Sequence, residues 1–135
     1  MAEVGVDASN IWEAAEYGEL QVIKDYVASG GDLEIASADG FQPLILAAFG
    51  QQLASVKVLL DSKADINATG VDGSTALHLA AQNGDVNIVR LLVERGADLT
   101  LLAQNETSAL WLSVAEGFED CVQLLANPKT VNLLD

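Results

Sequence analysis

The chain repeats itself at a period of 33 residues over most of its length. Asp39-Gly40 returns as Asp72-Gly73, and Leu46-Ala47-Ala48 returns as Leu79-Ala80-Ala81. One step earlier, the position of Leu46-Ala47-Ala48 is filled by Glu13-Ala14-Ala15. Chance similarity does not hold such a register without insertions through about four copies. A fixed period of this size indicates stacked supersecondary units, each of which buries its apolar face on its neighbours.

At 135 residues the chain is long enough for one domain. We expect that domain to cover residues 1–135, with copies at about 6–38, 39–71, 72–104 and 105–135. Hydrophobic residues make up 50% of the chain and aromatic residues only 5%. The core must therefore consist mainly of Ala, Leu, Val and Ile, which suits thin and closely stacked helices. The single cysteine, Cys121, allows no internal disulfide framework.

The third copy gives the clearest local signals, and they predict two helices. Thr75 is a capping residue in front of the Ala-rich segment 76–83, and Gly84 is suited to end that helix. Asp85 can cap a second helix that runs to about Arg95, with apolar residues at helical spacing. Applied to every copy, this pattern of turn, short helix, loop and longer helix predicts an all-α fold.

Two long motifs in this copy resemble the ankyrin repeat. Asp72-Gly73-Ser74-Thr75-Ala76-Leu77-His78-Leu79-Ala80-Ala81 is similar to the family's D-G-x-T-P-L-H-L-A-A. Residues 88–98 are similar to its I-V-x-L-L-x-x-G-A-D, and the resemblance covers roughly residues 8–127. It implies a solenoid of four helix-loop-helix repeats with turn tips, in which the first and last copies act as capping repeats. It also implies a function in protein recognition.

Several copies depart from the family pattern. Glu13 puts a charge at a stacking position, so residues 8–35 are expected to be the N-terminal cap. Lys63 stands where other copies have Gly30 and Gly96, which predicts a left-handed backbone at a residue that has a Cβ.

The end of the fourth copy leaves two alternatives open. Pro128 should stop its last helix. Either the array ends there in an irregular cap, or the chain was cut from a longer array.

The charge restricts the class of partner. The 20 acidic and 6 basic residues give a formal net charge of −14, which would repel nucleic acid and anionic membrane surfaces. Basic protein segments would be attracted, unless the acidity serves only solubility. No apolar run reaches the ~18 residues of a membrane span, and the first residues do not form a secretory signal. We expect a monomer in the cytoplasm, with the nucleus as the alternative location.

No residue pattern predicts catalysis, a metal site or a cofactor. His78 is the only histidine, and at this ankyrin position the side chain is expected to bond neighbouring turns. Cys121 aligns with Ile88 on an apolar helix face, so a buried structural thiol is expected rather than a nucleophile. We therefore expect no enzyme.

The resemblance places partner contacts on the concave surface formed by turn tips and first helices. Carried over by position, the predicted contact residues are Glu16, Tyr17, Asp39, Phe41, Phe49, Val71, Asp72, Ser74, Gln82, Asn83, Asn105, Trp111 and Glu116. Phe41 and Phe49 should lie near each other as exposed anchors, unless one or both fold back onto the neighbouring repeat. Trp12 and Trp111 occupy the His78 position and are expected to be mostly packed, with one ring edge reaching the groove.

Three further hypotheses come from the resemblance. The residues around Asn67 resemble ankyrin asparagines that an oxygen-sensing dioxygenase hydroxylates, although the side chain more often stabilises the loop. Residues 24–28, and 116–117 with 121–122, resemble segments of a small ankyrin protein that inhibits the actin capping protein. The chain could instead be a structural spacer from a longer array, with no partner of its own.

Overall fold

A computed structural model of the chain describes residues 11–126, and these residues are helical, as predicted. No strand is assigned among them, apart from an isolated antiparallel bridge between Ala103 and Thr107. The elements in order are α1 (Ile11–Tyr17), α2 (Leu20–Ala28), α3 (Pro43–Phe49), α4 (Leu53–Asp61), α5 (Ala76–Asn83), α6 (Val86–Glu94), the 3₁₀ turn η2 (Gln104–Glu106), α7 (Ala109–Glu116) and α8 (Glu119–Ala126).

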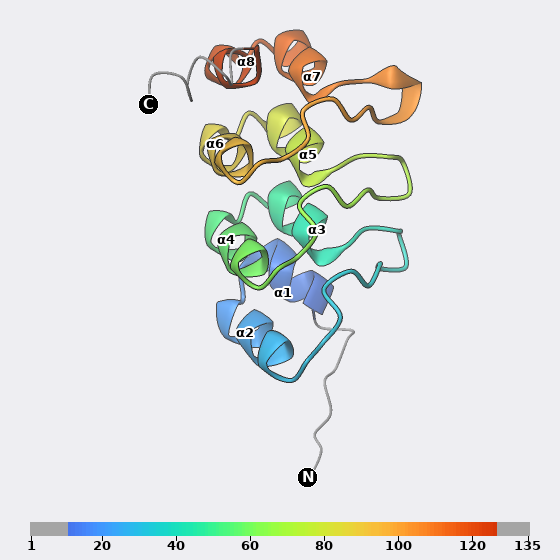
Figure 1. Cartoon of the computed structure of the whole chain (residues 1–135), viewed down its shortest axis with the longest axis vertical. Coiled ribbons are helices and arrows are strands. Elements are labelled where there is room, and N and C mark those ends of the chain that lie inside the picture. The colour runs from blue at the N-terminus through green and yellow to red at the C-terminus, as the bar shows by residue number, and fades with distance from the viewer. Residues whose placement is uncertain (1–10, 127–135) are drawn as a thin grey trace.

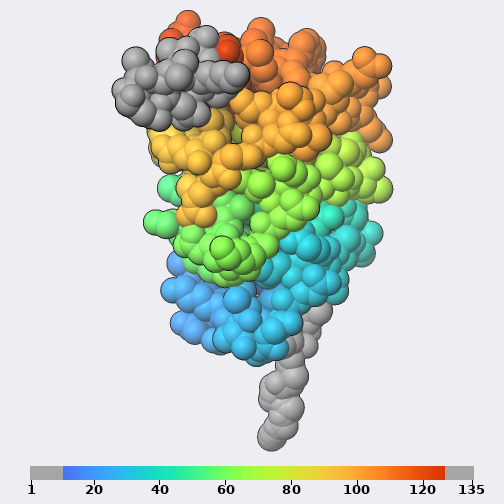
Figure 2. All heavy atoms as spheres, viewed as in Figure 1, coloured from blue at the N-terminus to red at the C-terminus, as the bar shows by residue number. Residues whose placement is uncertain are grey.

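The helices form two parallel columns in a single stack (Figure 1). The first helices α1, α3, α5 and α7 pack on one another in that order, and the second helices α2, α4, α6 and α8 do the same. The turns between successive pairs project on the side of the first helices (Figure 1). Each copy forms a band across the molecule in the space-filling view (Figure 2). The predicted solenoid is confirmed, and the boundaries proposed between the copies stay a prediction.

Small residues at the contact between first helices set the spacing of the stack. Ala14, Ala47 and Ala80 occupy the same position of successive copies and are fully buried. A methyl side chain lets neighbouring helix backbones approach closely, and the surrounding core is completed by larger aliphatic residues such as Ile23 and Leu59. Glu13 on α1 is exposed, as expected for a charge in the first layer of the stack.

The capping residues predicted in the third copy are confirmed. The Thr75 hydroxyl accepts a hydrogen bond from the backbone N–H of His78 at 3.3 Å, and the Asp85 carboxylate accepts one from Ile88 at 3.2 Å. Gly84 ends α5 with a left-handed φ of 72°. These contacts satisfy backbone groups that a helix end leaves unpaired.

The tip of the fourth copy differs from the others, which was not predicted. The second and third tips turn at Gly40 and Gly73, whose φ angles are 89° and 78°. The fourth tip has Glu106 at that position, and both Asn105 and Glu106 take a positive φ, of 64° and 57°. These residues lie in the short turn η2, where Asn105 departs from helical geometry. The predicted helix stop at Pro128 lies outside the described residues.

The left-handed conformation at Lys63 leads to a stability prediction. Its φ is 78°, close to the 80° of Gly30 and the 86° of Gly96. A residue with a Cβ is disfavoured there by about 1 kcal/mol. We expect Lys63→Gly to raise the free energy of unfolding by about that amount in urea denaturation. Lys57→Gly, in the middle of α4, is the matched control and should lower it by about 1 kcal/mol. An unchanged or lower stability for Lys63→Gly would contradict the assigned strain.

Candidate functional site

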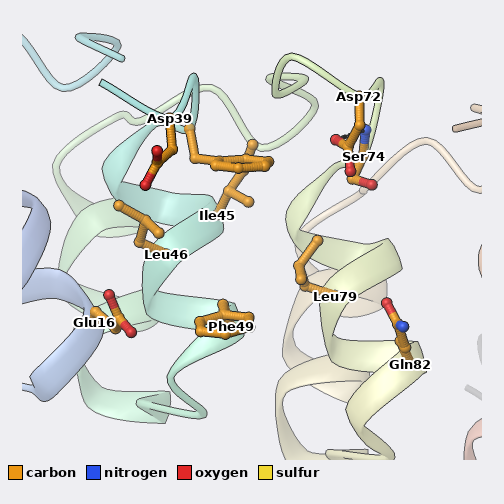
Figure 3. A pocket seen from close by; sticks show the side chains of 10 residues that line it. Glu16, Asp39, Ile45, Leu46, Phe49, Asp72, Ser74, Leu79 and Gln82 are labelled. Atoms are coloured by element: carbon orange, nitrogen blue, oxygen red, sulfur yellow. Dashed lines mark hydrogen bonds between the residues drawn. The ribbon is translucent and has the colours of Figure 1, made fainter. Parts of the chain in front are cut away.

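A groove between the second and third copies lies on the face of the turn tips and first helices (Figure 3). Its volume is about 330 Å³. We call it the α3–α5 groove, and its lining residues are Glu16, Asp39, Phe41, Ile45, Leu46, Phe49, Asp72, Ser74, Leu79 and Gln82. Asp39, Asp72 and Ser74 lie toward one end, and Glu16, Phe49 and Gln82 lie toward the other (Figure 3).

Helix α3 supplies one wall through residues spaced four apart. Phe41 precedes the helix, and Ile45 and Phe49 follow at intervals that bring side chains onto one helix face. Pro43 begins α3, where its fixed φ suits the first helical turn and its missing N–H is not needed. The start of the helix is therefore fixed, and the aromatic residues stand at its two ends.

The two phenylalanines differ in how far they are buried. The Phe41 ring is half-buried and lies against the backbone of Gly70, where a Cβ would come within 2.5 Å of Cδ1 of the ring. Phe49 is 51% exposed. Phe41 thus packs partly against the turn that follows the second helix of its copy, whereas Phe49 is open to solvent. Both line the same groove, as predicted.

Hydrogen bonds between copies hold the walls of the groove in register. The backbone N–H of Val71 donates to the carbonyl of Gly40 at 2.9 Å, which joins the second and third tips. The Asn83 side chain donates to the carbonyl of Phe49 at 3.2 Å, which joins the ends of α5 and α3. Asp72 accepts a hydrogen bond from the backbone N–H of Ser74 at 3.0 Å, so its carboxylate has a defined orientation.

The cations of the described chain lie on one side of the solenoid, whereas acidic residues lie on both sides. Glu16, Asp39 and Asp72 stand around the groove, and no cation lines it. Every Lys and Arg within residues 11–126 lies on a second helix or in the loop just after one: Lys24, Lys57, Lys63, Arg90 and Arg95. The face of tips and first helices is therefore negative along the described chain.

The predicted contact residues fall into two groups. Those that line the groove are Glu16, Asp39, Phe41, Phe49, Asp72, Ser74 and Gln82. Those that lie outside it are Tyr17, Val71, Asn83, Asn105, Trp111 and Glu116. Prediction missed the apolar floor of Ile45, Leu46 and Leu79, because the position of Leu46 and Leu79 was interpreted only as a stacking position and Ile45 was not considered. Leu46 and Leu79 are half-buried, so they serve the stack and the groove at once.

The expectation that Trp111 is mostly packed was wrong. Its side chain is 59% exposed, whereas His78 at the same position of the third copy is 2% exposed. His78 is covered by the next copy, and no following copy stacks on Trp111 within the described residues. Trp12 is packed as expected, and its Nε1–H donates to the carbonyl of Ile35 at 3.0 Å.

His78 has the structural role that was predicted. The backbone N–H of Thr75 donates to Nδ1 at 3.1 Å, so the ring proton is on Nε2, which donates to the carbonyl of Thr107 at 3.1 Å. Burial lowers the pKa of His78 below its ordinary value, and the hydrogen bonds to the carbonyls of Thr107 and Leu101 oppose that shift. The ring is neutral and ties the third copy to the fourth.

Cys121 and Asn67 also occupy structural positions. Cys121 is buried, and burial raises the pKa of its thiol, an effect to which Asp85 and Asp120 add. The Asn67 side-chain oxygen accepts a hydrogen bond from the backbone N–H of Asp98 at 2.8 Å, which links successive loops. Hydroxylation of Asn67 stays a prediction. No cluster of three potential metal ligands is present among residues 11–126.

Comparison with protein families identifies the architecture. A family model described as ankyrin repeats in three copies matches residues 11–103 and again residues 70–135. The chain belongs to the ankyrin-repeat family. Ankyrin repeats are generally protein–protein interaction modules and are typically not enzymes. No curated protein matches the chain. In the described part of this ankyrin-repeat chain, no helix has the length and apolar character needed to cross a membrane.

The buried His78 predicts a defined pH dependence of stability. Its pKa is about 6.5 in an unfolded chain and lower in the folded one. Its contribution is therefore fully present above pH 6.5 and is lost as pH falls through the folded-state pKa. We expect urea denaturation between pH 7.5 and 5 to show a steeper loss of stability for the natural chain than for His78→Gln. Equal slopes for the two proteins would contradict a neutral buried imidazole.

Proposed function

We propose that the chain is a non-catalytic protein-binding module that seats a segment of its partner in the α3–α5 groove. The observation that carries the proposal is the 51% exposed Phe49 above an apolar floor. Its counterparts in the other copies are Glu16, Gln82 and Ala115. The repeat does not require an aromatic residue there, and large exposed aromatics are typical interface anchors.

The charge of the groove defines the kind of partner. Carboxylates stand at both ends of an apolar floor, so a basic and partly apolar segment complements it. Aromatic anchors supply most of the affinity, while the negative face raises the association rate and disfavours acidic competitors. Two of the predicted contacts outside the groove, Val71 on the third tip and Tyr17 on α1, extend this concave surface. We further propose that the module acts as a monomer, in the cytoplasm or the nucleus.

A spacer function within a longer array has one observation in its favour. Trp111 and Val114 on α7 are 59% and 57% exposed, whereas the matching His78 and Ala81 are 2% and 0% exposed. These apolar groups stand where a neighbouring repeat covers the earlier copies. A spacer function, however, does not account for the exposed Phe49 or for the groove that it lines. Myotrophin-like inhibition of the actin capping protein is a weaker alternative, because the segments that suggest it, residues 24–28 and 116–117 with 121–122, do not line the groove.

Alanine substitution at two of the exposed aromatic residues, Phe49 and Trp111, tests the proposal. Proteins retained by the immobilised chain from a lysate of its source are identified, and their affinities for purified variants are measured by calorimetry. Phe49→Ala should weaken binding by about 30-fold, the size of an interface hot spot, and leave the melting temperature nearly unchanged. Trp111→Ala removes an equally exposed aromatic residue outside the groove and should leave the affinity unchanged.

Two results would overturn the assignment. Unchanged affinity in Phe49→Ala would remove the groove from the binding site. Loss of binding in Trp111→Ala alone would move the site to the end of the stack.

A further inference from the structure

We propose that the side chain received by the α3–α5 groove is an arginine of the partner. The inference rests on the proposed function and deepens it, because it names the anchor that gives the groove its selectivity. Four features of the described residues carry it: the division between apolar and acidic lining, the two aromatic rings, the unpaired carboxylates and their position on adjacent tips.

The lining of the groove is complementary to a long side chain that has an apolar stem and a charged end. Ile45, Leu46 and Leu79 form its floor, and Asp39 and Asp72 stand at one end on opposite sides of the groove (Figure 3). Arginine and lysine side chains bury their methylene stems on apolar surface while their charged ends stay in a polar environment. A wholly apolar side chain in the groove would remove the carboxylates from water without giving them a hydrogen-bonding partner, which costs free energy.

The aromatic residues favour a cation. Phe41 is held against Gly70, so its ring cannot retreat toward the backbone on that side, while the solvent-exposed Phe49 stands toward the opposite end of the groove, which carries Glu16 (Figure 3). A cation within ~6 Å of an aromatic ring is attracted by the negative face of that ring. Guanidinium also stacks on aromatic faces and is less strongly hydrated than ammonium.

The carboxylates of the groove have no ion-pair partner in the described chain. Within residues 11–126 the one salt bridge joins Arg95 to Asp61, on the side of the second helices. Asp72 uses one oxygen, Oδ1, to accept a hydrogen bond from Ser74. An incoming cation therefore meets carboxylates that are oriented and not already neutralised.

The placement of two carboxylates on neighbouring tips distinguishes arginine from lysine. The tips that carry Asp39 and Asp72 are tied by the backbone hydrogen bond from Val71 to Gly40 at 2.9 Å. A planar guanidinium presents several N–H donors in a fixed fork, so it can bind one carboxylate through two parallel hydrogen bonds and still direct N–H groups toward the opposite side of the groove. The lysine ammonium group is a compact charge that binds these carboxylates with less directional preference. The groove is thus selective for arginine over lysine and over neutral side chains.

A random peptide library selected on the immobilised full chain tests this inference. The selected peptides are resynthesised with each arginine replaced by lysine or by citrulline, the neutral isostere. Replacement of arginine by citrulline should weaken binding by at least tenfold. The affinity of the lysine peptide should lie between those of the arginine and citrulline peptides. Asp39→Asn and Asp72→Asn should each weaken the arginine peptide and leave the citrulline peptide unaffected. Asp61→Asn, outside the groove, is the matched control and should change neither.

The possible results separate the two proposals. One result is that the selected peptides lose affinity for Phe49→Ala and yet bind the natural chain equally well when citrulline replaces arginine. That result would overturn the arginine anchor and leave the groove as the binding site. Peptides indifferent to Phe49→Ala, or no selected peptides at all, would overturn both. Arginine peptides that lose affinity with Asp61→Asn and not with Asp39→Asn or Asp72→Asn would also overturn the inference.

Discussion

The close packing of the first helices is the contact on which the rest of the structure depends. Ala14, Ala47 and Ala80 are fully buried at the same position of consecutive copies, so each first helix lies near the next. This spacing brings the second and third tips within backbone hydrogen-bonding distance, from Val71 to Gly40. The α3–α5 groove forms because successive tips and first helices are regularly spaced, whereas the side chains that face the groove differ between copies.

The proposed contact residues stand where the 33-residue period is broken at the surface. Phe49 replaces the Glu16, Gln82 and Ala115 of the other copies, and it lies on a scaffold whose buried positions barely change. The period thus serves stability, and its local exceptions are available for recognition. Charge follows the same division, since acidic side chains surround the groove and the described cations lie on the other side of the solenoid. A partner therefore meets a face of uniform sign.

Much of the fold could be predicted because its signals are local and repeated. Thr75 and Gly84 predicted the limits of α5, and the glycines that align with Lys63 predicted its left-handed backbone. The site was only partly predictable, because exposure depends on what stacks above a residue. Trp111 shares the position of His78 but lacks its covering neighbour, and Leu46 belongs to both the stack and the groove. Such double roles cannot be read from one copy alone.

Mapping a bound partner by NMR tests most directly the claim that the α3–α5 groove is the recognition site. The backbone and methyl resonances of the chain would be followed as a retained partner is added. The account predicts that the largest changes occur at Ile45, Leu46 and Leu79, on the floor of the groove. Changes confined to the outer surfaces of α2, α4 and α6, or to the exposed face of α7, would contradict it.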